Sequence, residues 1–180
     1  KEAQRVLEAE AKAIFASSKK ISLNFSKCID LLIDCKGTVV ISGIGKSGNI
    51  GKKITSTLAS LGTPSIFLHT SDAFHGDLGI LRRDDLLICI SNSGETDELV
   101  RLLNYANRNA IKSIAITGNI NSKISKEAYV SLNSSVESEA CPLNLAPTCS
   151  TSVTMALGDA LASICAMEKG FKEIDFARFH

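Results

Sequence analysis

The sequence predicts an α/β protein in which helices cover both faces of a parallel sheet. Short apolar segments alternate with longer helical patterns, as they do in consecutive βαβ units. The strand candidates are mostly apolar throughout, which is typical of strands buried on both faces. Two of them end in loops rich in glycine and serine. Since 44% of the 180 residues are hydrophobic, we expect residues 1–180 to form a single domain with a substantial core.

Two helices are expected before the sheet. Residues 2–17 place apolar side chains such as Leu7 and Ile14 on one helical face, and a second helix is expected from about 23 to 35. Residues 1–35 therefore predict an N-terminal helical hairpin, suited to packing against another subunit.

The sheet is expected to begin after Gly37. Right-handed crossovers would place helices on both faces and give a three-layer α/β/α architecture around a five-stranded parallel sheet. The strands are expected at 38–43, 65–69, 86–91, 113–117 and 129–132, and the helices at 47–61, 96–109, 121–127 and 151–169. The last helix is apolar or small on all sides, which predicts a central buried helix. Asp159 within it should have a hydrogen-bond partner.

Composition argues against several classes of partner. The net charge is +1 and aromatic residues make up only 5%, so neither nucleic acid nor a membrane surface is expected to bind. No pair of the six cysteines has CxxC spacing, which favours reduced core thiols over disulfides or a zinc site. No signal peptide is recognised and no apolar run reaches membrane-spanning length. We therefore expect a cytoplasmic protein.

The two glycine-serine loops lie where parallel sheets bind ligands, at the carboxyl ends of strands. The first, Gly43-Ile44-Gly45-Lys46-Ser47-Gly48, offers backbone N–H groups and a helix start to an anion. It fits G-x-G-x-x-G, but no acidic residue follows at about 20 residues to hold a ribose. A Walker loop would need glycine in place of Val40. A phosphorylated small molecule is thus favoured over a nucleotide.

The second loop, Ser91–Thr96, carries three hydroxyls within six residues at a helix start. One hydroxyl suffices for an N-cap. Three, together with an asparagine and a glycine, suit a phosphate monoester better. Glu95 is explained by the helix dipole, whereas Glu98, further on, is a candidate to face the ligand.

Other groups with acid–base chemistry lie in loops. His75 follows the second strand, on the same edge of the sheet as the two glycine-serine loops, and Glu139 precedes a connection that contains Pro142. Lone histidines are more often structural than catalytic, and most loop glutamates are simply solvated. His69, at the end of a strand, is interpreted as structural.

At these residues the chain resembles the sugar isomerase (SIS) domain family, and within it the arabinose 5-phosphate isomerases that begin Kdo biosynthesis. The block from 139 to 162 is the most specific part of the resemblance. The matching stretches are Gly43–Gly51, His75–Gly79, Ser91–Glu98, Glu139–Leu143, Leu145–Thr148, Leu157–Ala162 and Phe176–Arg178. This resemblance implies the flavodoxin-like SIS fold. Relatives often continue with two regulatory CBS domains, which these 180 residues do not include.

The resemblance also implies a phosphate cradle and a set of active-site residues. The residues that would bind the phosphate or substrate are Gly45, Ser47, Ser91, Asn92, Ser93 and Thr96. The catalytic candidates are Lys46, His75, Glu98, Glu139 and His180. Two positions depart from the family pattern: Asn144 replaces a glycine, and Cys149 replaces a small hydroxyl residue.

The implied reaction interconverts D-arabinose 5-phosphate and D-ribulose 5-phosphate through an enediol(ate), towards lipopolysaccharide or capsule. No cofactor or metal is required. Glu139 is expected to be the base, and Lys46 the partner of the oxyanion or phosphate. His75 and His180 would open the ring or move protons, with Glu98 orienting one of them; the two glutamates could exchange roles.

The main rival interpretation is a regulatory module that binds a sugar phosphate without chemistry. Such a module needs the hydroxyl cradle but not a glutamate with two histidines. We also expect a homo-oligomer, a tetramer built from dimers, in which at least one of His75 and His180 enters a neighbour's site, as in related isomerases of this fold. The pathway's end product, CMP-Kdo, is a candidate effector.

Overall fold

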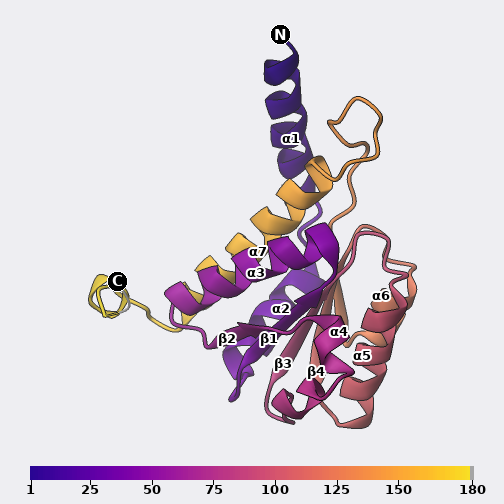
Figure 1. Cartoon of the computed structure of the whole chain (residues 1–180). Helices are drawn as coiled ribbons and strands as arrows, with labels where there is room; N and C mark the ends of the chain where they lie inside the picture. Colours follow the sequence, from indigo (N-terminus) through magenta and orange to yellow (C-terminus); the bar gives the residue numbers. More distant parts are fainter. Residues whose placement is uncertain (179–180) are drawn as a thin grey trace.

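The computed structural model of the chain describes residues 1–178. Its centre is a five-stranded sheet with the order β2-β1-β3-β4-β5, in which every neighbouring pair is parallel (Figure 1). The strands are β1 (Val39–Gly43), β2 (Ser65–Phe67), β3 (Leu86–Ile90), β4 (Lys112–Thr117) and β5 (Val130–Asn133). This order is that of flavodoxin-like folds, so the predicted fold class is confirmed.

The sheet is covered on both faces, as the apolar strands require. One face carries α2 (Leu23–Asp34), α3 (Gly45–Ser60) and α7 (Cys149–Glu168), and the other carries α4 (Thr70–Ala73), α5 (Asp97–Arg108) and α6 (Lys123–Glu127). Alternate residues of each strand serve the two cores: Ile41 packs with α3 and α7, while Val40 packs with α5. Each layer therefore buries one set of strand side chains.

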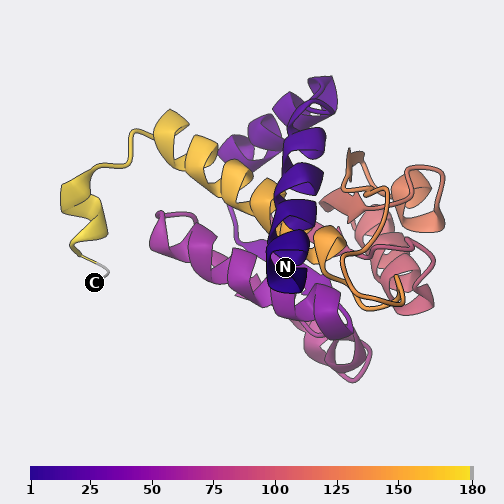
Figure 2. The same cartoon turned by 90° about the horizontal axis from the view of Figure 1, so that it is seen from above.

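The helix α1 (Glu2–Ser18) projects from the body of the molecule (Figure 1). Viewed from above, it crosses the end of α7, which runs beside α3 (Figure 2). The Ser152 hydroxyl of α7 donates to the Glu10 carboxylate of α1. Both predicted N-terminal helices are present, but α1 and α2 each pack on α7 more than on one another. The hairpin is therefore open.

The prediction that α7 is buried on all sides is wrong in part. Leu161 and Cys165 are buried, but Met167 is 65% exposed, because the described elements leave one side of α7 open to solvent there. Asp159 has the expected partner, the ammonium group of Lys53, although its side chain is 41% exposed. By length and composition α7 could cross a membrane, yet 56% of its apolar window is buried within the fold, as in a core helix.

The remaining described elements are short. They are a 3₁₀ turn, Asp77–Ile80, and the C-terminal helix α8 (Glu173–Phe176), which lies away from the body in both views (Figures 1 and 2). The six cysteines are free thiols, and four of them are buried. Burial raises the pKa of the Cys28 thiol to about 12, so this core cysteine stays protonated and behaves as a small apolar side chain.

Candidate functional site

The first glycine-serine loop turns directly from β1 into α3. A Cβ on Gly48 would lie 2.7 Å from the Gly43 carbonyl oxygen, so this close approach of backbone to backbone requires glycine. Within the described residues, the N-cap of α3, Ile44, supplies no side-chain cap. The first turn, with exposed Lys46 and half-buried Ser47, therefore presents N–H groups where an anion would be stabilised.

The second loop carries a cluster of hydroxyls, formed by Ser91, Ser93 and Thr96. The Ser91 hydroxyl lies 2.9 Å from that of Thr96 and 3.5 Å from that of Ser93, and it accepts the Gly94 N–H at 3.1 Å. Thr96 is the N-cap of α5, yet its hydroxyl makes no cap bond to the described helix. An ordinary N-cap therefore does not explain this cluster.

The loop is held from behind by α6. Gly94 has φ +71°, and a Cβ there would lie 2.0 Å from the Ser122 hydroxyl, so glycine is needed for both conformation and space. The Glu95 carboxylate accepts the Lys123 N–H at 3.1 Å and forms a salt bridge with its ammonium group at 3.4 Å. Glu95 thus fastens the loop to the start of α6, a role that sequence reasoning missed.

The two loops meet because their strands are neighbours. Gly43 at the end of β1 pairs with Ile90 at the end of β3. Ser47 and Asn92 line one small pocket, whose other wall comes from Ser150 and Thr151 at the start of α7. The structure therefore brings the two predicted cradle loops together and adds a third helix start.

This third wall escaped the sequence prediction, which began the helix at 151. The run Thr148-Cys149-Ser150 contained the signal, since hydroxyl residues before an apolar helix indicate an N-terminus. The observed helix begins at Cys149, so Ser150 and Thr151 lie in its first turn.

Glu139 lies against this helix start. Its carboxylate Oε2 accepts the Thr148 N–H at 2.8 Å, the Thr148 hydroxyl at 3.1 Å and the Ser150 N–H at 3.1 Å. Partial burial raises the pKa of Glu139, but the hydrogen bonds from Ser150 and Thr148 outweigh burial and hold it below its usual range. Glu139 is thus an ionised cap of α7, bonded to a residue that lines the pocket.

The loop that carries Glu139 is shaped by Asn144. This residue has φ +54°, a left-handed conformation that asparagine tolerates and glycine adopts readily, so its place in a glycine position has a structural reason. Its side-chain oxygen also accepts the Glu139 N–H at 2.6 Å. The same loop receives a hydrogen bond from α1, since Arg5 donates to the Ala140 carbonyl at 2.6 Å.

The other catalytic candidates are not joined to this arrangement by any interaction within the described chain. Lys46 and Glu98 are exposed in the first turns of α3 and α5, and His75 is exposed in the loop after α4. His180 lies outside the described residues. His69 has the structural role predicted for it, because its Nδ1 accepts the Ser71 N–H at 3.3 Å and caps α4. Residues 1–178 contain no group of three His, Cys, Asp or Glu side chains able to hold a metal ion.

Comparison with known proteins identifies the family. The SIS domain model matches residues 31–164. The chain belongs to the SIS domain family. It is 49% identical over 178 residues to the arabinose 5-phosphate isomerase KdsD of Pseudomonas aeruginosa, covering 99% of this chain and 55% of that protein. It is 47% identical over 182 residues to the arabinose 5-phosphate isomerase KpsF of Escherichia coli O6:H1, covering 98% and 54%.

A solved SIS-domain relative is similar over its whole length. The Escherichia coli CFT073 protein c3406, solved in complex with arabinose 5-phosphate, superposes with a TM-score of 0.95 at 38% identity. The match covers 99% of this SIS chain and 95% of that one. By contrast, the chain spans about half the length of the curated relatives it matches. The family and the fold are thereby established.

Proposed function

We propose that this SIS-domain protein is an aldose–ketose isomerase that interconverts D-arabinose 5-phosphate and D-ribulose 5-phosphate. The observation that carries the proposal is the hydroxyl cluster at the start of α5, which no helix cap accounts for and which faces the first turn of α3 across neighbouring strands. Hydroxyls and uncapped helix starts are suited to a phosphate. Relatives named as arabinose 5-phosphate isomerases, and a relative solved with that sugar phosphate bound, support this choice of substrate.

In this proposal the cradle holds the phosphate, which does not react. Gly45, Ser47 and the second loop, with Asn92, bind the phosphate and thereby orient the sugar carbons. The furanose form of arabinose 5-phosphate must open before the reaction, and His75 or His180 would assist that step. The acid–base residues of the site then move a proton from C2 to C1 through an enediol(ate), without a cofactor.

Glu139 is the proposed base. Its lowered pKa keeps it ionised at neutral pH, as a proton acceptor must be. The three described bonds from Thr148 and Ser150 all reach Oε2, so Oε1 would take the C2 proton. Lys46 would stabilise the developing oxyanion or the phosphate. Glu98 would orient a histidine, and is the replacement base if Glu139 serves only as a helix cap.

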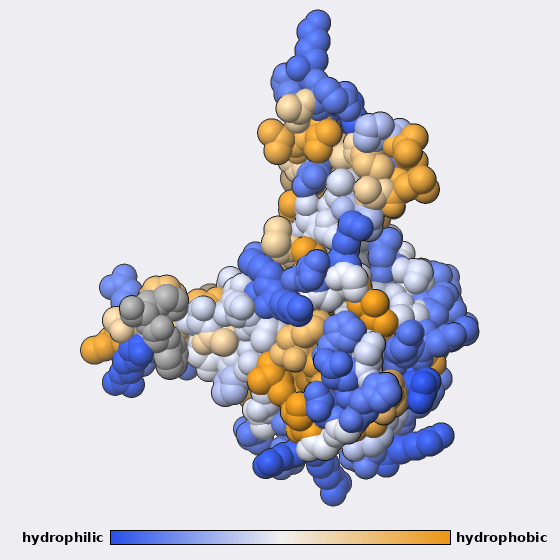
Figure 3. Space-filling view, viewed as in Figure 1, coloured by the Kyte–Doolittle hydropathy of each residue, from blue (hydrophilic) through white to orange (hydrophobic). Residues whose placement is uncertain are grey.

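The protein is further proposed to be a homotetramer built from dimers, with a histidine of one subunit completing the site of another. Apolar side chains gather on α1 and on the loop beside it (Figure 3). Leu7 and Phe15 are 70% and 64% exposed, and Leu143 and Leu145 are each 77% exposed. A second subunit would remove this surface from water. The resemblance to the family supports a cytoplasmic location and CMP-Kdo as an effector.

A direct assay tests the proposed reaction. The protein is incubated with ribulose 5-phosphate, and arabinose 5-phosphate is followed by NMR. We expect both sugars at equilibrium, with the C2 position exchanging protons with solvent, and unchanged turnover after EDTA treatment. Binding without conversion would favour the regulatory module. Activity that is lost with EDTA and restored by one defined metal would contradict the metal-free scheme.

A further inference from the structure

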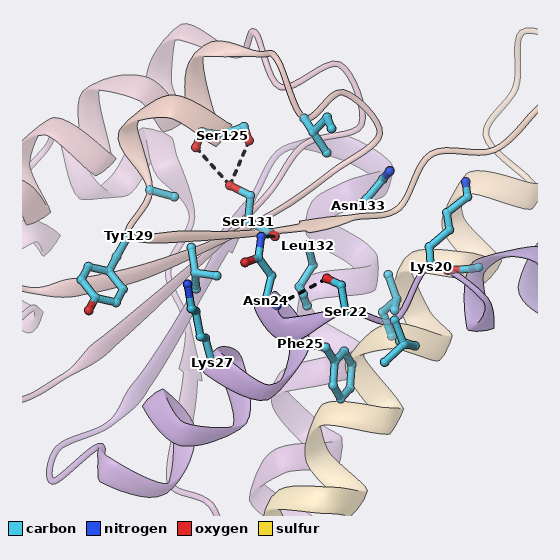
Figure 4. Close-up of a pocket in the computed structure, with 16 residues that line it drawn as sticks. Lys20, Ser22, Asn24, Phe25, Lys27, Ser125, Tyr129, Ser131, Leu132 and Asn133 are labelled. Atoms are coloured by element: carbon cyan, nitrogen blue, oxygen red, sulfur yellow. Dashed lines mark hydrogen bonds between the residues drawn. The ribbon is translucent and has the colours of Figure 1, made fainter.

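A cavity lies away from the sugar-phosphate loops, at the outer edge of the sheet. It has a volume of about 510 Å³ and lies between the α1–α2 turn and the edge strand β5 (Figure 4). We call it the edge cavity; its polar lining includes Lys20, Ser22, Asn24, Lys27, Ser131 and Asn133. This volume is in the range of small-molecule sites.

Positively charged side chains line the edge cavity, and no described acidic side chain does. Lys20 and Lys27 belong to its wall, and the described lining residues include no aspartate or glutamate. Lys20 donates to the carbonyl and hydroxyl oxygens of Ser135, at 2.8 and 2.9 Å, and Lys27 forms no salt bridge with any described residue. A third cation is close by, since the Lys112 ammonium group lies 3.8 Å from the centre of the Tyr129 ring. An anion would be attracted to this site.

A buried hydroxyl in the wall also lacks a partner. Ser17 is only 5% exposed and lines the edge cavity, yet its hydroxyl has no hydrogen bond within the described chain. Leaving a buried polar group unpaired costs free energy, so such groups are nearly always satisfied. The hydroxyl oxygen is itself shielded from solvent, so a group in the cavity would reach it only after a shift of the wall. The apolar part of the wall, with Phe25, Leu132 and Tyr129, would cover the body of an organic molecule.

The occupant suggested by these groups is a small molecule rather than an added strand. The outer edge of β5 is already used, because the Asn24 amide donates to the Ser131 carbonyl at 3.2 Å. Lys20 also donates a hydrogen bond to the Ser135 carbonyl, just beyond the strand. An extended peptide would have to break these bonds before it could pair with β5.

From these observations we infer that the edge cavity is a second ligand site, for a small organic anion that carries a phosphate or carboxylate group. The anionic group would contact Lys27, beside Tyr129, and the organic part would lie along the apolar wall; Lys20, at the other end of the cavity (Figure 4), would add a longer-range attraction. This inference is independent of the isomerase proposal, because the cavity shares no lining residue with the pocket of Ser47 and Asn92.

The test uses the full chain and the probe 4-fluorophenyl phosphate, followed by ¹⁹F NMR. Arabinose 5-phosphate is present in excess, so that the sugar-phosphate loops are occupied if they bind it. We expect saturable binding of the probe, and much weaker binding of neutral 4-fluorobenzyl alcohol. Lys27→Gln should weaken binding by about tenfold, since a charge-assisted hydrogen bond is lost, and Lys20→Gln/Lys27→Gln should weaken it further because a second positive charge is removed.

The matched control is Lys126→Gln, an exposed lysine on the neighbouring helix α6 that does not line the edge cavity. It should leave probe affinity unchanged. Lys27→Gln is the informative single change, since no described hydrogen bond of Lys27 is lost with it. Circular dichroism verifies folding. Absence of saturable binding, or equal affinities for the lysine variants, the control and the unaltered chain, would overturn the inference. The inference would also be overturned if the probe bound only at the sugar-phosphate loops. In that case Ser93→Ala would weaken probe binding and the lysine variants would not.

Discussion

The proposed phosphate-binding loops and the proposed acid–base residues are built in different ways. The loop Ser91–Thr96 is fixed by bonds among its own hydroxyls and by α6 behind it. The acid–base candidates come from separate segments, and most of them are exposed. Among the described candidates, Glu139 alone is held by side-chain hydrogen bonds, and it is held as the cap of a helix. Under the proposal, binding would reside within two short loops, whereas the chemistry would depend on segments that must be brought together.

This difference suggests that one chain suffices for phosphate binding, whereas catalysis would need an assembly of subunits. A single chain brings both loops of the proposed cradle to the ends of β1 and β3. In the described part of the same chain Lys46, His75 and Glu98 are exposed. If the isomerase proposal is right, loss of a cradle hydroxyl should affect affinity, and loss of an acid–base residue should affect rate. The predictions below test this division.

The largest effect is expected for Glu139→Gln. Loss of the general base should lower the rate by about 10²- to 10⁴-fold, while the phosphate still binds because the cradle belongs to other loops. The measurements are turnover, solvent-deuterium exchange at C2 and the dissociation constant of the substrate. Glu137→Gln, at an exposed position two residues earlier, is the matched control and should retain full activity. Near-normal exchange in Glu139→Gln would move the base role to Glu98, and Glu98→Gln would then lose exchange instead.

A second prediction concerns hybrids of inactive subunits. If His180 enters a neighbour's site, a dimer of one Glu139→Gln and one His180→Ala subunit contains one intact site. Mixing the two variants should therefore restore part of the activity. Glu139→Gln mixed with Lys46→Ala serves as the control, because both residues are proposed to act in their own chain and no hybrid site is intact. No recovery with His180→Ala or with His75→Ala would place the whole site in one chain.

The sequence predicted the fold well because the relevant signals are local. The uninterrupted apolar run at Leu86–Ile90 indicated a strand buried on both faces, and the structure has it in the middle of the sheet. Gly43–Gly48 and Ser91–Thr96 were recognised for the same reason, since strand end, glycine and hydroxyls adjoin in sequence. Asn144 was noted only as a departure from the family pattern, and its positive φ supplies the reason.

Contacts between distant segments could not be predicted in this way. Glu139 bonds to Thr148 and Ser150 across a loop whose path depends on Asn144 and on Arg5 of α1, and no periodic pattern reports such a path. The exposure of Met167 was not predicted for a similar reason, because the composition of α7 does not reveal how many layers surround this helix. The two charges of the edge cavity belong to the α1–α2 turn and to α2, and no pattern in the sequence indicates that they line one cavity with β5.

A smaller effect is expected for Ser93→Ala. The lost hydroxyl would contact the phosphate, so KM should rise by about tenfold with a modest change in kcat, the usual effect of losing a bond to a charged group. Some loss of kcat is allowed, because phosphate binding also orients the reacting carbons. Ser163→Ala, at an exposed position on α7, is the control. An unchanged KM would show that the Ser93 hydroxyl serves only its bond to the Glu95 N–H, at 3.3 Å.

The smallest expected effect is on stability, and it isolates the structural role of Glu139 from its proposed chemical one. As a cap of α7, Glu139 should contribute about 1 kcal/mol to the free energy of unfolding, the usual magnitude for a capping side chain. Its pKa is lower in the folded chain than the ordinary value of 4.5, so the folded state favours the ionised carboxylate. This contribution is therefore fully present above about pH 4.5 and is lost as the pH falls through the folded pKa. Urea unfolding of the original chain and of Glu139→Gln at neutral and acidic pH measures it, with Glu137→Gln as the control. A difference between the two proteins that stays constant down to the lowest pH at which both fold would show that the cap does not depend on the charge.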